Sequence, residues 1–184
     1  MTETPPLRDL GWTPAGFALP ATDGRTLTLD DIRGARGTLV MFICNHCPYV
    51  LAVLDRLKDD TRTLIAEGIG VAAICSNDAV THPADSFERM CEMAVAQAFP
   101  FPYLHDESQA VARDFGAACT PDFFGFDAGL RLRYRGRLDA FGRAPRPEGA
   151  PRELVEAMRL IADTGAGPRE QVASVGCSIK WKPA

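Results

Sequence analysis

Apolar residues in this chain are grouped in short runs separated by segments of helical period. Residues 38–43 and 69–75 are almost entirely apolar, which is typical of strands buried on both faces of a parallel sheet. Between them, apolar residues recur every three or four positions from Val50 to Ile65, and this spacing predicts one face of a long helix. Gly68 follows as a C-terminal cap. The pattern therefore predicts a strand–helix–strand unit.

The rest of the chain repeats this alternation and then changes. Residues 17–29 hold two short apolar runs around Asp23-Gly24, a dipeptide typical of hairpin turns. Further on, the pattern predicts helices over 87–98, 106–115 and 151–162, and strands over 101–104, 123–126 and 130–138. Three β/α units are thus followed by an antiparallel hairpin and a closing helix, which predicts an α/β fold with a mixed sheet.

One domain accounts for the length of 184 residues. Residues 1–14 are polar and proline-rich, and we expect an arm on the surface. Residues 15–164 hold the periodic pattern of the domain itself. Residues 165–184 form a C-terminal tail without helical period, which contains Cys177 and Trp181.

Charge and hydropathy exclude several classes of function. The net charge of −4 argues against a binder of nucleic acids or anionic membranes. The longest apolar runs are of strand length, so no membrane span is expected. The N-terminus lacks the features of a secretory signal, which makes the cytoplasm the expected compartment. Structural disulfides are rare there, so the six cysteines are interpreted as one redox pair and four single residues.

Cys44-Asn45-His46-Cys47 is the redox pair, a CxxC motif between a predicted strand and a predicted helix. This spacing brings both sulfurs within bonding reach, and the helix N-terminus favours a thiolate. Cys44 is predicted to face solvent and act as the nucleophile. Cys47, in the first turn, is predicted to be the resolving thiol. Asn45 is a candidate N-cap, and a protonated His46 would stabilise the thiolate further.

The other four cysteines are interpreted singly. Cys75 ends a buried strand and Cys91 lies on the apolar face of a helix, so both are predicted to be core residues. Cys119 is either a small buried residue or a third thiol near the motif. Cys177 lies in a polar tail without an evident core position. It either exchanges with the CxxC pair as a third thiol or belongs to a tail docked by Trp181.

Charged residues elsewhere are predicted to have structural roles. Four arginines alternate with other residues on one face of the last strand: Arg131, Arg133, Arg135 and Arg137. We expect a charged face that discourages edge pairing, with an anionic contact to substrate or a partner subunit as the alternative. His82 and His105 lie next to helix starts and are predicted to be structural. Asp85, Glu88 and Glu92 are predicted to form a solvated helix face.

Four segments, in this order, resemble the peroxiredoxin-like CxxC group of the redoxin (alkyl hydroperoxide reductase/thiol-specific antioxidant) superfamily. They are residues 42–49, 119–124, 134–139 and 176–182. The resemblance implies a thioredoxin-like three-layer sandwich, with a mixed central sheet and an N-terminal β-hairpin extension. It also implies a cis peptide bond between Thr120 and Pro121 opposite the motif, where the backbone of Thr120 pairs with an extended substrate segment. His46 implies a pair more oxidising than thioredoxin's own.

These observations predict a thiol–disulfide oxidoreductase that uses Cys44 and Cys47 without a bound cofactor. Its expected partners are a protein or small-molecule disulfide substrate and a thiol electron donor. No nucleic acid or membrane partner is expected, and the oligomeric state, including a homodimer, is left open.

Two other classes of function stay open. A thiol peroxidase would use Cys44 as its peroxidatic residue, but the related peroxiredoxins place a hydroxyl three residues before that cysteine, where this chain has Met41. A thioredoxin-like module could instead bind a metal or a partner. A closed zinc site needs four ligands, and the candidates to complete one are Cys177, His82 and His105.

Overall fold

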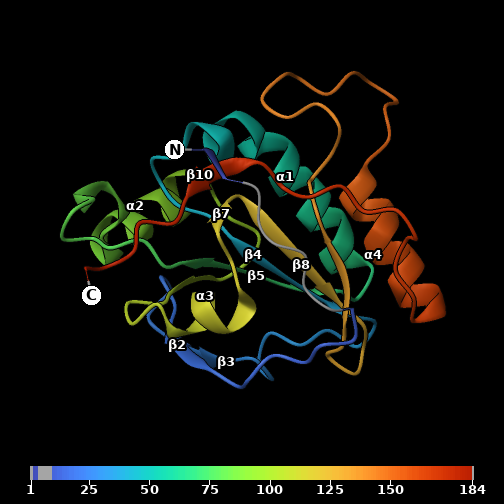
Figure 1. Ribbon diagram of the computed structural model, residues 1–184, viewed down its shortest axis with the longest axis horizontal. Coiled ribbons are helices and arrows are strands. Elements are labelled where there is room, and N and C mark those ends of the chain that lie inside the picture. Colours follow the sequence, from blue (N-terminus) through green and yellow to red (C-terminus); the bar gives the residue numbers. More distant parts are fainter. Residues whose placement is uncertain (1, 4–9, 184) are drawn as a thin grey trace.

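The computed structural model describes residues 2–3 and 10–183, and a five-stranded mixed sheet forms its centre (Figure 1). In spatial order the strands are β6 (Tyr103–His105), β5 (Gly70–Cys75), β4 (Thr38–Phe42), β8 (Asp122–Phe126) and β9 (Leu132–Gly136). The first three are parallel to one another, whereas β8 runs antiparallel to β4, and β9 to β8. The predicted order of parallel units followed by an antiparallel hairpin is therefore confirmed.

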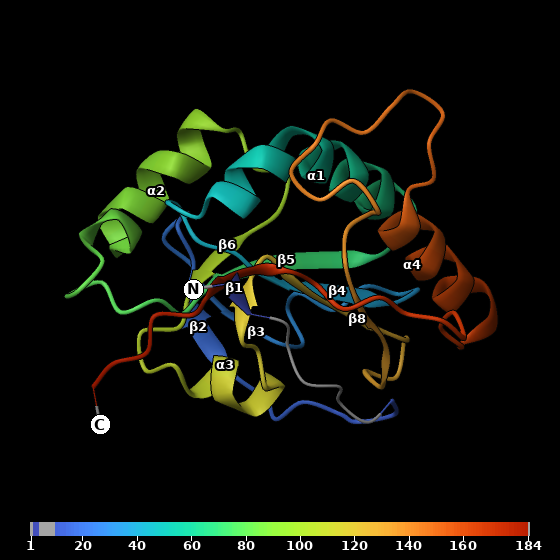
Figure 2. The same cartoon turned by 45° about the horizontal axis from the view of Figure 1, so that its top comes forward.

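Two layers cover this sheet, one on each face (Figure 2). One face carries α1 (Pro48–Ala66), α2 (Phe87–Ala96) and α4 (Glu153–Thr164). The other carries α3 (Ala110–Phe115) and the hairpin of β2 (Ala18–Pro20) and β3 (Thr26–Thr28). The fold is the expected thioredoxin-like three-layer sandwich with an N-terminal hairpin.

Strand alternation divides the apolar residues between two cores. Leu39 and Met41 of β4 point into the core beneath α1 and α4. Val40 and Phe42 point into the core that contains α3 and the hairpin. Adjacent strand residues face opposite sides, so a strand buried on both faces must be apolar throughout. This is why residues 38–43 form an unbroken apolar run.

The described part of the N-terminal arm packs on the domain. Trp12 lies edge-on to Phe115 of α3, with ring centroids 5.4 Å apart, and the N–H of Gly11 donates to the carbonyl of Leu132. Residues 1 and 4–9 of the predicted arm lie outside the described residues.

The C-terminal tail contains a strand that its sequence does not predict. β10 (Gly176–Ser178) pairs antiparallel with β7 (Cys119–Thr120) on one side and with β1 (Thr2–Glu3) on the other. Ile179, which is 3% exposed, anchors it in the core below the sheet. Trp181 is 37% exposed and stacks on Arg113 instead. Trp181 therefore contacts the domain at its surface, whereas Ile179 supplies the buried contact of the tail.

The prediction that the arginines of residues 131–137 form one charged face that discourages edge pairing is also wrong. Arg135 is 6% exposed and pairs with Asp122 at 3.0 Å. The flanking arginines form further ion pairs: Arg131 and Arg133 with Asp127, and Arg137 with Glu153. The edge of β9 is covered by the tail, because Gln171 accepts from the N–H of Arg135 and the carbonyl of Val172 accepts from the N–H of Arg137.

Helices α2, α3 and α4 differ from their predicted bounds by a few residues. The helix expected to begin at 106–109 begins at Ala110, because Gln109 takes a left-handed conformation (φ 63°). Asp106 still satisfies the first turn by accepting from the N–H of Ala112 at 2.9 Å. None of the helices in the described residues has the length and apolarity needed to cross a membrane.

Candidate active site

The CxxC motif lies where β4 ends and α1 begins. Cys47 immediately precedes α1, and Pro48 takes the first helical position, where no N–H is required. The two sulfurs contact each other. Cys44 is 1% exposed and Cys47 is 0% exposed. The expectation that Cys44 faces solvent is wrong, because the chain itself covers the motif.

The loop of Thr120 and Pro121 lies directly against both thiols. The Thr120–Pro121 peptide bond is cis, as expected. The hydroxyl of Thr120 lies 3.3 Å from the sulfur of Cys44. The thiol of Cys47 donates to the carbonyl oxygen of Thr120 at 3.1 Å. The structure thus brings the four residues predicted from distant segments into one site.

The two thiols form a hydrogen bond with each other. The hydrogen bond between them raises the pKa of Cys44 and lowers the pKa of Cys47, while burial opposes the ionisation of both. The Asp85 carboxylate raises the pKa of Cys44 further. At Cys47, hydrogen bonds with the side chains of Thr120 and Cys177 lower the pKa further. The first ionisation therefore belongs to the pair and not to one sulfur.

Asp85 is the site residue that the sequence did not reveal. It lies in the 3-10 helix η1 (Pro83–Asp85) and is completely buried, so its assignment to a solvated face is wrong. Its carboxylate accepts from the N–H of Asn45 and from Nδ2 of Asn77, each at 2.8 Å. Asn45 is 40 residues away and Asn77 eight, and the apolar periodicity around Asp85 signals neither partner. Glu88 and Glu92 are exposed as predicted.

Asn45 was a candidate N-cap of α1, but the N-cap is Cys47. The side chain of Asn45 instead forms hydrogen bonds with neighbouring elements. Its amide donates to the carbonyl of Ala84 at 2.9 Å. Its side-chain oxygen accepts from the hydroxyl of Tyr103 at 3.0 Å. Asn45 therefore ties the CxxC loop to η1 and to β6.

His46 lies on the open side of the site, with its side chain 32% exposed. Its Nδ1 is 2.7 Å from a carboxylate oxygen of Asp85, and its ring stacks on His82 with centroids 5.5 Å apart. Donor atoms of Cys44, His46 and Asp85 lie within 4.8 Å of one another, close enough to share a metal ion. A closed zinc site needs a fourth ligand. His105 stacks on Phe87 instead.

Cys177 joins the site from the C-terminal tail. Cys177 packs against the core that contains the CxxC pair, and its thiol contacts Cys47. Cys75 is a core residue as predicted, but Cys91 is only half-buried. Cys119 is buried, and its thiol points to the carbonyl of Pro121 at 3.7 Å.

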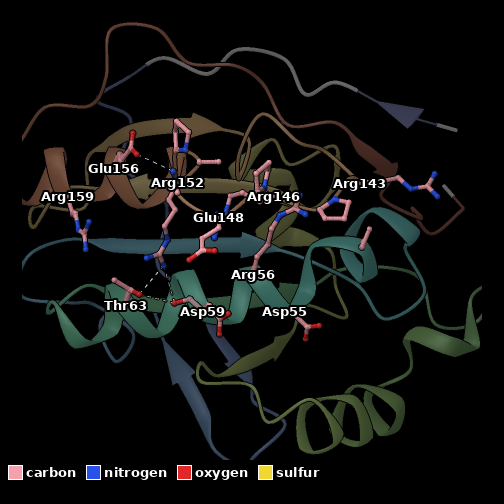
Figure 3. Close-up of a pocket in the computed structure, with 16 residues that line it drawn as sticks. Asp55, Arg56, Asp59, Thr63, Arg143, Arg146, Glu148, Arg152, Glu156 and Arg159 are labelled. Carbon is pink, nitrogen blue, oxygen red and sulfur yellow. Dashed lines mark hydrogen bonds between the residues drawn. The ribbon is translucent and has the colours of Figure 1, made fainter.

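Two hollows lie near the site. A pocket of about 220 Å³ beside Pro121 is lined by Tyr49, Phe123 and residues 172–175 of the tail. A larger groove of about 940 Å³ lies between α1, α4 and the loop 143–152 (Figure 3). Four of its five arginines have carboxylate partners: Arg56 with Asp139, Arg146 with Asp60 and Asp139, Arg152 with Asp60, and Arg159 with Glu67. The fifth, Arg143, lies over the ring of Tyr49. The groove is therefore held by ion pairs, and the apolar pocket is the one that adjoins the thiols.

Comparison with known proteins identifies relatives of the whole chain. The AhpC/TSA family matches residues 13–135. An uncharacterized conserved protein from Geobacillus kaustophilus is 40% identical, with a TM-score of 0.91 over 100% of this chain and 98% of that one. The hypothetical protein SMc02350 from Sinorhizobium meliloti is 36% identical, with a TM-score of 0.89 over 98% and 99%.

A more distant structure shares the fold alone. The thioredoxin domain of a thiol-disulfide oxidoreductase from Bacteroides vulgatus is 12% identical, with a TM-score of 0.59 over 70% of this chain and 89% of that one. A search of the curated proteins found no match.

Proposed function

The chain belongs to the AhpC/TSA family, and we propose that it is a thiol–disulfide oxidoreductase whose redox pair is Cys44 and Cys47. Family membership and the thioredoxin-like fold support a thiol redox function. The observation that carries the finer proposal is the contact of two adjacent sulfurs with Thr120, at the N-terminus of α1. Neighbouring thiols at a helix N-terminus are suited to opening and closing a disulfide.

The reaction proceeds by two exchanges. The Cys44 thiolate attacks one sulfur of a substrate disulfide, forming a mixed disulfide and releasing the other substrate sulfur as a thiolate. Cys47 then loses its proton and attacks the sulfur of Cys44. The substrate leaves as a dithiol, and the pair is left as a disulfide. A thiol donor reduces the pair again, and we place this cycle in the cytoplasm, where such donors are abundant.

The buried thiols set a condition on substrate binding. Thr120 was expected to offer its backbone to an extended substrate segment, but it is paired with Cys177 of β10. An extended substrate therefore binds this edge only after β10 has moved away from β7. The apolar pocket beside Pro121 would then receive a side chain of the substrate.

The test traps the mixed disulfide. Reduced Cys47→Ser protein is incubated with insulin, a disulfide-bonded protein, and the products are mapped by mass spectrometry. A covalent adduct at Cys44 is expected, and the unsubstituted protein should reduce insulin catalytically with a dithiol donor. Cys91→Ser is the matched control and should behave like the unsubstituted protein. Absence of both adduct and reduction would refute the oxidoreductase.

Thiol peroxidase is the second candidate, and one observation favours it. Met41 is buried in the sheet, so no hydroxyl is available three residues before Cys44, yet Thr120 brings one to 3.3 Å from the sulfur. Peroxide would then oxidise Cys44 to a sulfenic acid, which Cys47 would resolve. Rapid trapping of that acid in Cys47→Ser protein would favour the peroxidase. Stoichiometric zinc in the purified protein would favour a metal site at Cys44, His46 and Asp85.

A further inference from the structure

We propose that Cys177 is a third redox residue, which strand β10 holds against the CxxC pair. In the oxidised protein it replaces Cys44 as the partner of Cys47 in the disulfide. The inference rests on the proposed function, because it requires that Cys44 and Cys47 form a disulfide. It assigns a chemical role to a tail residue that lies more than 100 positions from the motif in sequence.

The register of β10 brings the Cys177 side chain to the thiols. Cys177 is directly opposite Thr120 in the antiparallel ladder, and Ser178 is opposite Cys119. Opposite residues on neighbouring strands point to the same side. The side chain of Thr120 points to Cys44, so the side chain of Cys177 points to the same site. There it contacts Cys47, which lies between two other thiols.

Strand β10 is held firmly in this register. The N–H of Ile179 donates to the carbonyl of Ala118 at 2.9 Å. The next residue, Lys180, donates its N–H to Oδ1 of Asn77 and accepts from the N–H of Asp78. Asn77 also binds the buried Asp85. The tail is thus anchored to the same network that positions the motif, and Cys177 is held in place and not merely near the site.

The position of β10 is that of an extended substrate. Substrate segments add to an exposed strand edge through main-chain hydrogen bonds, and in this site that edge is the backbone of Thr120 beside the thiols. β10 occupies it and places a cysteine against the redox pair. The arrangement is an intramolecular version of the substrate complex, with Cys177 in the place of the substrate cysteine.

The exchange needs no external oxidant beyond the one that makes the first disulfide. The Cys177 thiolate attacks the Cys47 sulfur of the Cys44–Cys47 disulfide. The new Cys47–Cys177 bond forms as the Cys44–Cys47 bond breaks, and the electron pair leaves on Cys44. The proton released by Cys177 passes to Cys44 or to solvent. One disulfide is present before and after, so the oxidation level of the protein is unchanged.

The order of events follows from the charges. In the reduced protein burial, and then the neighbouring Cys47 sulfur, raise the pKa of Cys177 to about 11. Oxidation of Cys44 and Cys47 to a disulfide removes the negative charge that the pair carries when ionised, and with it one cause of the raised pKa of Cys177. Cys177 therefore becomes easier to ionise only after the first disulfide has formed.

The test compares oxidised protein with a Cys177→Ser variant. Each reduced protein receives one equivalent of oxidised dithiothreitol or diamide, and free thiols are then alkylated at neutral pH. In the unsubstituted protein, mass spectrometry should find peptide 37–56 linked to peptide 170–180, with the label on Cys44. In Cys177→Ser the label on Cys44 should fall at least tenfold, because Cys44 stays in the disulfide with Cys47.

Further variants assign the bond and separate the two proposals. Cys44→Ser should form the Cys47–Cys177 disulfide, Cys47→Ser should abolish the link, and Cys91→Ser should change nothing. A Cys44–Cys47 disulfide in the unsubstituted protein, with no link to Cys177 there or in Cys44→Ser, would overturn the third thiol and leave the oxidoreductase standing. No Cys44–Cys47 disulfide in Cys177→Ser, with either oxidant, would instead remove the oxidoreductase itself.

Discussion

The carboxylate of Asp85 accepts a hydrogen bond of 2.8 Å from the backbone N–H of Asn45, the residue that follows Cys44. The same carboxylate lies 2.7 Å from Nδ1 of His46. A buried acidic group therefore holds the CxxC loop by its backbone and also acts on the thiols through its charge. These two effects are separable by substitution.

Asp85→Asn should lower the pKa of Cys44. The carboxylate raises that pKa, and the amide keeps the shape while it removes the charge. The titration of the pair, followed by the ultraviolet absorbance of the thiolate, should shift to lower pH. Glu88→Gln, on the exposed face of α2, is the control. An unshifted titration in Asp85→Asn would mean that its charge does not reach the thiols.

Asp85→Ala should destabilise the fold as well. It leaves the N–H of Asn45 and the amide of Asn77 without their acceptor, and lost hydrogen bonds to a charged group cost about 3 kcal/mol in total. Urea unfolding of the reduced protein measures this loss. A loss below about 1 kcal/mol would show that water replaces the carboxylate.

Gly176→Ala should expose the redox pair. A Cβ at position 176 would lie 2.0 Å from the carbonyl oxygen of Thr120, so β10 cannot keep its place on β7. Alkylation of Cys44 in the reduced protein should accelerate by about tenfold or more, which corresponds to roughly 1.4 kcal/mol of lost pairing. Gly16→Ala, whose Cβ would meet no atom within 4 Å, should leave the rate unchanged. Equal rates would show that β10 does not limit access.

Asp60→Asn should destabilise the domain without changing the chemistry of the thiols. Asp60 is fully buried on α1 and binds Arg146 and Arg152 at 2.7–2.8 Å, which ties the loop 143–152 to the helix. Removing the charge leaves two arginines without their shared partner, at a cost of about 3–5 kcal/mol. Asp59→Asn is the matched control, since Asp59 is exposed and pairs only with Arg62. Equal unfolding midpoints would contradict the structural role.

The sequence predicted the helices and strands that show a regular spacing of apolar residues. It did not predict the contacts between segments that are far apart in the chain. β4, α1 and the hairpin β8–β9 were predicted because burial imposes a visible alternation on them. β10 has three residues, too few to show a period, and its pairing depends on Thr120. Asp85 was misassigned because its neighbours in sequence resemble a solvated helix, whereas its partners, Asn45 and Asn77, come from other loops.

The same limit applies to the arginines of β9. Period two put them on one face, but the pairing shifts register between Gly125 and Phe126, and Leu132 and Tyr134 pack in opposite cores. Nor does the period carry information about Asp122, which pairs with Arg135 from the neighbouring strand. Nor does it reveal the tail that covers the edge. Among the cysteines, position at the strand–helix junction identified Cys44 and Cys47, whereas the contact of Cys177 with Cys47 required the three-dimensional fold.

Asp122 should give the stability of the protein a pH dependence of unusual sign. Burial, only partly offset by Arg135, raises the pKa of Asp122 from 3.8 to about 6. A carboxyl whose pKa is raised on folding contributes stability that is fully present below its unfolded pKa and is lost as the pH rises through its folded pKa. Two pKa units correspond to about 3 kcal/mol, lost between about pH 4 and about pH 6.

Urea unfolding from pH 4 to pH 7, compared with Asp122→Asn, tests this sign, because the amide cannot ionise. The difference in unfolding free energy between the two proteins should change by about 3 kcal/mol. As the pH rises, the unfolding free energy of the unsubstituted protein should fall relative to that of Asp122→Asn. Asp127 should show the opposite pH dependence. Burial raises the pKa of this carboxyl, but hydrogen bonds from the backbone of Arg131 and the side chain of Arg133 outweigh burial and lower the pKa. This carboxylate contributes stability that the unsubstituted protein loses on acidification. Asp127→Asn should lack that contribution and so lose less stability as the pH falls. A flat difference curve for Asp122→Asn would mean that Arg135 fully compensates the burial of its partner.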